Sequence, residues 1–205
     1  MSAELGRALD ALRRGGVVAC PTETFVGLLA DALDPRAVDA VAALKGRPKG
    51  LPMALLVPSI EAIDAVAEPL GGEALALAER HFPGPLTLVV RARAGLSPWL
   101  VQDGTVGLRV PGPSLALDLV RAFGGPLTAT SANLSGEPAV RHVRELAPEL
   151  RAGLAAAVLG DAPGGLPSTI VDVTRYPMRV LRPGALSIAE LGLAEPSSRG
   201  QIPRR

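Results

Sequence analysis

The chain has 205 residues, 48% of them hydrophobic and 2% aromatic, and 21 Lys and Arg against 20 Asp and Glu give a net charge of +1. This length and hydrophobic content suffice for one sizeable core, and the balanced charge gives no general attraction to nucleic acid or to an anionic membrane. The scarcity of aromatic residues argues against a stacking platform for single-stranded nucleic acid, and one cysteine with two histidines argues against a disulfide framework or a zinc site.

The first half of the chain alternates helical and strand patterns. Apolar residues at helical spacing predict a helix over 5–12, which ends at two glycines before the strand VVAC at 17–20. The polar turn PTET follows at 21–24. Asp34 as N-cap and a proline at the first helical position then open a helix that ends in the basic stretch KGRPKG at 45–50.

The remaining elements follow the same alternation. We expect Ser59 to cap a short helix, and further helices at 73–81, 113–125 and 141–151. Strands are predicted in MALLV (53–57), LTLVVRA (86–92), TVGLRV (105–110), PLTAT (126–130), AAAVL (155–159), STIVDV (168–173) and MRVLR (178–182).

This order predicts an α/β fold, with a twisted sheet of parallel and antiparallel strands flanked by helices. The close strand pairs near 85–110 and 168–182 are expected to be antiparallel. We expect one domain over residues 1–193 and a frayed polar tail at 194–205. Because no secretory signal or long apolar run is visible, we expect a cytoplasmic protein that does not contact membranes.

The stretch KGRPKG raises the first chemical question. Lys45 and Gly46 are explained by a helix C-cap, but Arg47 and Lys49 are not. Three cations in one turn are stabilised when a polyanion lies among them, so capping and phosphate binding both remain open.

Short polar side chains gather in three other turns. TSANLSG at 130–136, PTET and LPSTIVD at 166–172 each follow or precede a strand, where loops of open α/β sheets hold ligands. Turn formation explains such residues equally well. Arg109 and Arg182 stand among apolar neighbours, so each needs an anionic partner, either a ligand or a salt bridge.

No nucleophile stands out. The sequence contains no Walker A loop, dinucleotide fingerprint, nucleophile elbow or zincin helix. Cys20 is interpreted as a buried strand residue, and neither histidine has a triad partner evident in the sequence. Hydroxyls and arginines without a nucleophile favour a reaction driven by positioning and phosphate neutralisation.

Seven motifs in order carry a resemblance: PTETFVGLLADA, KGRP, FPGPLTLVV, GLRVP, TSANLSG, PSTIVD and LRPGA. From Gly15 to about Gly184 the chain resembles the YrdC-type threonylcarbamoyl-adenylate synthases, in a short, single-domain form. The resemblance implies a twisted α/β sheet with a concave, positively charged cavity.

The same resemblance implies an activity. The family makes threonylcarbamoyl-AMP and pyrophosphate from L-threonine, bicarbonate and ATP, and partner proteins transfer the threonylcarbamoyl group to the tRNA adenosine next to the anticodon. Mg²⁺ is expected on the ATP phosphates, with no protein metal site and no organic cofactor. Contact with tRNA or other RNA is a further implication.

The resemblance also assigns roles to residues. The ATP-binding set is Lys45, Arg47, Thr105, Ser131, Asn133, Ala139 and Arg182, and within it the catalytic set is Lys45, Arg47, Ser131 and Asn133. The threonine-binding set is Thr24, Arg109 and Ser168.

Three departures leave an alternative open. Val26 stands where the family commonly has tyrosine, Leu29 where it has glycine, and Leu51 where a polar or basic residue often follows KGRP. A diverged paralogue that binds RNA or ribosomal particles through its basic cavity is therefore the competing interpretation.

Overall fold

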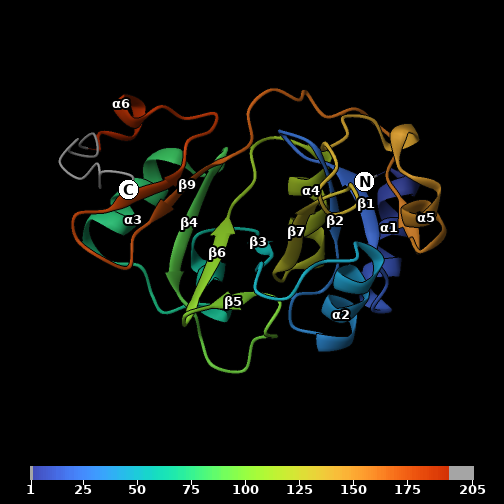
Figure 1. Cartoon of the computed structure of the whole chain (residues 1–205), viewed down its shortest axis with the longest axis horizontal. Helices are drawn as coiled ribbons and strands as arrows, with labels where there is room; N and C mark the ends of the chain where they lie inside the picture. Colours follow the sequence, from blue (N-terminus) through green and yellow to red (C-terminus); the bar gives the residue numbers. More distant parts are fainter. Residues whose placement is uncertain (1, 194–205) are drawn as a thin grey trace, which may run out of the picture.

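The computed structural model describes residues 2–193, which form a mixed sheet covered by helices (Figure 1). The strands are β1 (Val18–Pro21), β2 (Val26–Leu29), β3 (Ala54–Leu56), β4 (Leu86–Arg91), β5 (Val101–Gln102), β6 (Thr105–Arg109), β7 (Leu127–Ser131), β8 (Ala156–Ala157), β9 (Thr169–Asp172) and β10 (Arg179–Arg182). The helices are α1 (Ala3–Arg13), α2 (Pro35–Leu44), α3 (Gly72–His81), α4 (Leu115–Phe123), α5 (Pro148–Ala152) and α6 (Ile188–Leu191), with 3₁₀ turns η1 (Glu61–Ala65) and η2 (Val143–Glu145).

The sheet runs in the order β10-β9-β4-β6-β3-β7-β2-β1-β8, with β5 added beside β6. The pairs β4–β6 and β9–β10 are antiparallel, which confirms the prediction for the close strand pairs. The pairs β3–β6, β4–β9 and β1–β8 are parallel. The predicted α/β class with a mixed sheet is thus confirmed.

Helices bury one face of the sheet and leave part of the other face open. α1 packs on α4, β1 and β8, and Figure 1 shows α1 at the β1 end of the molecule and α3 at the β9 end. Along β4, Leu86, Leu88 and Val90 are buried in the core, whereas Thr87, which alternates with them, faces a hollow on the opposite side. This open face positions the candidate site.

The α2 boundaries follow from local chemistry, as predicted. The Asp34 carboxylate accepts a hydrogen bond from the Arg36 N–H at 2.9 Å, and a proline occupies the first turn. At the other end Gly46 adopts φ 55° and donates to the Ala43 carbonyl, while the Arg47 N–H donates to the Ala42 carbonyl. These two bonds form a Schellman motif, so KGRPKG begins at a helix exit.

Two predicted helices are wrong in extent. Instead of a helix capped by Ser59 there is only η1, because Ala67 already pairs with Ala92 beside the sheet. The helix predicted over 141–151 is split into η2 and α5, because a proline lacks an amide hydrogen and restrains Ala147 before it to an extended conformation.

Two strands were missed, and one segment stays untested. β2 and β5 were not predicted from the sequence. The polar tail at 194–205 lies outside the described residues. Across residues 2–193, no helix is long and apolar enough to cross a membrane.

Candidate functional site

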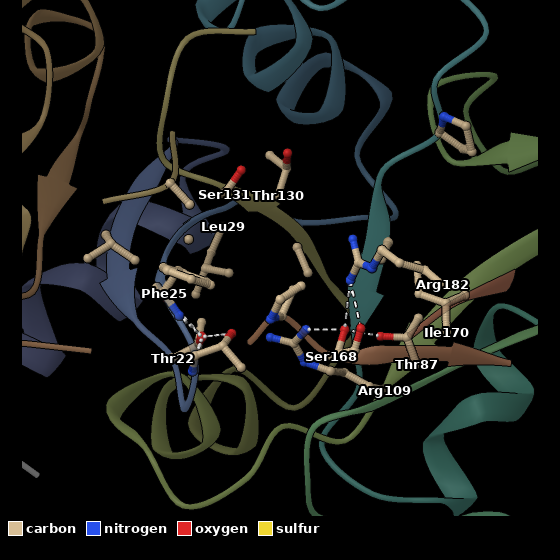
Figure 2. A pocket seen from close by; sticks show the side chains of 18 of the residues that line it. Thr22, Phe25, Leu29, Thr87, Arg109, Thr130, Ser131, Ser168, Ile170 and Arg182 are labelled. Carbon is tan, nitrogen blue, oxygen red and sulfur yellow. Dashed lines mark hydrogen bonds between the residues drawn. The ribbon is translucent and has the colours of Figure 1, made fainter. Parts of the chain in front are cut away.

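A cavity of about 520 Å³ opens on the exposed face of the sheet (Figure 2). Seven strands and their flanking loops contribute to it. Its lining residues are Thr22, Thr24, Phe25, Val26, Gly27, Leu29, Arg47, Pro52, Ala54, Thr87, Arg109, Ala129, Thr130, Ser131, Ala139, Pro167, Ser168, Ile170 and Arg182. This set of described residues includes three arginines and no aspartate or glutamate.

The PTET turn places both of its threonines at the cavity, and one of them also fixes the turn. The Thr22 hydroxyl donates to the Phe25 carbonyl at 2.8 Å and accepts the amide hydrogens of Thr24 and Phe25. The Thr24 hydroxyl lies 3.1 Å from that of Thr22 and is buried in the same wall. Thr22 therefore fixes the turn, and Thr24 lies beside it in the cavity wall.

Arg109 is held by a carboxylate that the sequence analysis did not assign. Its Nε lies 3.2 Å from Oε1 of Glu23, and both side chains are 11% exposed. Burial lowers the pKa of Arg109, and the neighbouring Glu23 carboxylate opposes that shift. The signal was present, because an arginine among apolar residues needs an anionic partner and PTET contains one.

Ser168 is the meeting point of two guanidinium groups and a second hydroxyl. Its Oγ accepts from Arg109 at 3.4 Å and from Arg182 at 3.3 Å, and it lies 2.8 Å from Thr87 Oγ1. Arg182 also donates to the Ser168 carbonyl at 2.8 Å. Figure 2 shows these four side chains on the wall facing Thr22 and Phe25. Burial and the neighbouring Arg109 lower the pKa of Arg182.

Lys45 lies behind the cavity rather than in its lining. Its ammonium group donates to the carbonyls of Ser131 and Asn133, the latter at 2.6 Å, and the residue is 3% exposed. The Ser135 hydroxyl returns a hydrogen bond to the Lys45 carbonyl at 3.1 Å. Burial, with the nearby Arg47, lowers the pKa of Lys45 to about 8. Lys45 thus joins the helix exit to the TSANLSG loop.

Arg47 is the cation of KGRPKG that lines the cavity. It donates to the carbonyls of Leu51 at 2.7 Å and Pro52 at 2.9 Å, and to the Thr130 hydroxyl at 3.2 Å. Burial lowers its pKa. Lys49 is exposed and is not in the lining. The capping interpretation therefore accounts for the backbone from Lys45 to Arg47, but not for the position of the Arg47 side chain in the cavity wall.

The structure brings most of the predicted site residues to this cavity. The lining contains Thr24, Arg47, Arg109, Ser131, Ala139, Ser168 and Arg182. Asn133 lies outside the lining, with its side-chain amide donating to the Leu134 and Glu137 carbonyls, and its buried Oδ1 has no partner. Thr105 lines an adjoining hollow of about 500 Å³, which shares Thr87 and Arg182 with the first cavity.

Two of the sequence departures lie in the wall of the cavity, and one lies outside. Val26 and Leu29 line it on β2, whereas Leu51 is 54% exposed. Within the described part of the chain, no group of three or more His, Cys, Asp or Glu could hold a metal ion.

Comparisons with known proteins agree on one family. The family model Sua5/YciO/YrdC, described as "Telomere recombination", matches residues 10–184. The threonylcarbamoyl-AMP synthase of Pyrococcus abyssi is 37% identical over 90% of this chain and 55% of its own length, and that of Coxiella burnetii is 35% identical over 68% and 75%. The chain spans about half the length of two of the curated relatives that it matches.

The structural comparison agrees. The crystal structure of P. abyssi Sua5 complexed with L-threonine superposes with a TM-score of 0.86 at 35% sequence identity. The match covers 91% of this chain and 56% of that chain.

Proposed function

The chain belongs to the Sua5/YciO/YrdC family, and we propose that it is a threonylcarbamoyl-AMP synthase, which makes this adenylate and pyrophosphate from L-threonine, bicarbonate and ATP. The observation that carries the proposal is the convergence of Arg47, Arg109 and Arg182 with Ser131 and Ser168 on one cavity. Its lining offers positive charge and hydroxyl groups, which suits two anionic substrates held side by side.

The amino acid occupies the Arg109 side of the cavity. Arg109 binds the substrate carboxylate, because its guanidinium is buried and Glu23 is the one carboxylate that contacts it among residues 2–193. Thr24 supplies a hydroxyl on one side. Ser168, which also belongs to the predicted threonine-binding set, acts by holding the guanidinium groups of Arg109 and Arg182. The crystal structure of the P. abyssi relative is a complex with L-threonine, and this supports L-threonine as the amino acid.

ATP lies beside it, with its phosphates between Arg47 and Arg182. Ser131 holds the reacting phosphate, the backbone at Ala139 contacts the nucleotide, and Thr105 reaches it from the adjoining hollow. Lys45 and Asn133 act from behind the lining. Lys45 adds positive potential, and its hydrogen bonds to the carbonyls of Ser131 and Asn133 hold the loop that carries both residues. These residues contribute to catalysis mainly by orienting ATP and by neutralising the charge of its phosphates.

The reaction proceeds in two balanced steps. The threonine ammonium group and bicarbonate give a carbamate, with release of water and one proton. An oxygen of the carbamate then attacks the α-phosphorus of ATP, the bond to the β-phosphate oxygen breaks, and pyrophosphate leaves. Arg47 and Arg182 neutralise the charge that develops on the leaving group. ATP brings Mg²⁺ on its phosphates, since the lining offers no carboxylate among the described residues.

The product serves tRNA modification in the cytoplasm. Threonylcarbamoyl-AMP is a mixed anhydride that hydrolyses readily, so we propose that a transferase partner takes it up and passes the threonylcarbamoyl group to the tRNA adenosine. A direct contact with tRNA during this transfer is part of the proposal.

The test measures pyrophosphate release with ATP, bicarbonate and L-threonine, with each omitted in turn, and identifies the adenylate by mass spectrometry. Release should require all three, and Arg47→Ala should abolish it. Arg36→Ala is the matched control and should retain activity, because Arg36 is an exposed arginine in the first turn of α2 and lies outside the lining. Absence of release, with tight binding of RNA instead, would establish the alternative of a binding paralogue.

A further inference from the structure

Thr87 lies where the two hollows on the sheet face meet. It belongs to the lining of both, together with Arg182, and it is 3% exposed. It stands on β4, paired in register with Ile170 of β9. The site roles assigned so far leave Thr87 without a function, although Figure 2 shows its side chain beside Ser168 on the same wall as Arg109 and Arg182.

Packing fixes the direction of its hydroxyl group. A Cβ at Gly107 would lie 3.6 Å from the Thr87 methyl carbon, so the methyl group lies over the glycine on the neighbouring strand β6. The Thr87 hydroxyl lies 2.8 Å from the hydroxyl of Ser168. Since a β-branched side chain has few rotamers, the methyl contact holds the hydroxyl toward Ser168 and the cavity.

Hydrogen-bond accounting then assigns the protons. A guanidinium group can only donate, so the Ser168 oxygen accepts from both Arg109 and Arg182. A hydroxyl has two lone pairs and one proton, and both lone pairs of Ser168 are used. The Ser168 proton is therefore donated to the oxygen of Thr87. The proton of Thr87 has no acceptor in any hydrogen bond found over residues 2–193.

A nearly buried donor without an acceptor, beside two guanidinium groups, matches an anionic oxygen. Building on the proposed function, we propose that Thr87 is a further substrate-binding residue, which donates its hydroxyl proton to the carboxylate of the amino-acid substrate. Arg109 supplies the charge for this carboxylate, and the Ser168 to Thr87 hydrogen bond orients the donor.

The experiment measures L-threonine binding by calorimetry on the full chain, without ATP. Thr87→Val, which removes the hydroxyl and keeps the shape, should weaken the Kd about tenfold. Thr87→Ser, which keeps the hydroxyl but loses the methyl contact that directs it, should restore part of that loss. Thr128→Val is the matched control, because Thr128 is a buried sheet threonine whose hydroxyl hydrogen-bonds the backbone at Ala30 and Leu28. It should lower the melting temperature and leave the Kd unchanged.

Steady-state kinetics provide a second readout, because a merely structural role for Thr87 would not change the KM for one substrate alone. In pyrophosphate release, Thr87→Val should raise the KM for L-threonine and leave the KM for ATP unchanged. If Thr87→Val does not fold, Thr87→Ala removes the same hydroxyl with less bulk and takes its place.

The outcomes separate this inference from the proposed function. Wild-type protein that binds L-threonine but releases no pyrophosphate ends the proposed function, while the Kd of Thr87→Val still decides the role of Thr87. An unchanged Kd in Thr87→Val, a Thr128→Val effect of the same size, or a wild type that does not bind L-threonine at millimolar concentration overturns the inference.

Discussion

Replacing Lys45 by methionine tests whether this lysine holds the TSANLSG loop in place. Methionine keeps the length and apolar stem of the side chain and removes the ammonium donor. The carbonyls of Ser131 and Asn133 then lose the hydrogen bonds that reach them across the sheet. The perturbation is thus confined to two acceptors and one charge.

The magnitude follows from two opposing effects. Each carbonyl left without a partner in a partly buried site costs about 1–3 kcal/mol. The wild-type protein bears the cost of burying the Lys45 ammonium, which is why the pKa of Lys45 is lowered to about 8. Methionine avoids that cost, which offsets part of the loss. We expect a net loss of about 2 kcal/mol in the free energy of unfolding, which lowers the melting temperature of a chain of this size by ~4–8 °C.

Calorimetric melting of the ligand-free protein measures this loss, and hydrogen exchange at residues 131–136 reports whether the loop loosens. Lys49→Met is the matched control, because Lys49 is an exposed lysine in the same turn. Equal melting temperatures for Lys45→Met and Lys49→Met, with unchanged hydrogen exchange in the loop, would refute the positioning role. Lys45 would then be interpreted as a residue that binds phosphate directly.

Three further predictions test the charges of the site. Lys45 is charged below its pKa of about 8 and neutral above it, so kcat/KM for ATP should fall as pH rises through 8, and Lys45→Arg should remove that inflection in a pH profile. Glu23→Gln should lower stability by about 3 kcal/mol in denaturant melts and strengthen L-threonine binding in calorimetry, since Arg109 loses its competing anion. Arg182→Lys keeps the charge but loses the two donations to Ser168, and steady-state kinetics should show a KM for ATP raised about tenfold.

Helix ends and turns could be predicted because their causes are local. Asp34 caps α2 through its own neighbour, and Gly46 ends it by adopting a positive φ. Gly124, with φ 81°, closes α4 in the same way. The start and end of these helices depend on residues within one turn, so they can be predicted from the sequence alone.

The errors come from tertiary pairing and from one local rule that was not applied. β2 contains Gly27, has no clear alternation and is buried throughout, and its pairing with β1 and β7 makes it a strand. The split before α5 could have been predicted, because Pro148 disfavours a helical conformation at the residue before it. Apolar spacing across 141–151 outweighed that signal in the sequence analysis.

The site could be predicted as a set of motifs, but not as a geometry. Thr87 and Ser168 are 81 positions apart, and the sheet order β9-β4-β6 makes them neighbours of Arg109. Spacing along the chain does not contain that order. Glu23 was overlooked for a different reason: the hydroxyls around it in PTET suggested ligand binding, and a buried carboxylate is recognised only when its arginine is located.

The charge distribution of the cavity indicates how stability and binding are divided. Burial lowers the pKa of Arg47, Arg109 and Arg182, and over residues 2–193 Glu23 is the one carboxylate found in contact with any of them. Carbonyl and hydroxyl oxygens satisfy their donors without neutralising their charge. The folded protein without ligand therefore retains unfavourable energy from its buried, mutually repelling guanidinium groups. An anionic ligand neutralises these charges, and the repulsion that it relieves contributes to its binding energy. Filling the wall with carboxylates would stabilise the free protein and weaken the substrate complex.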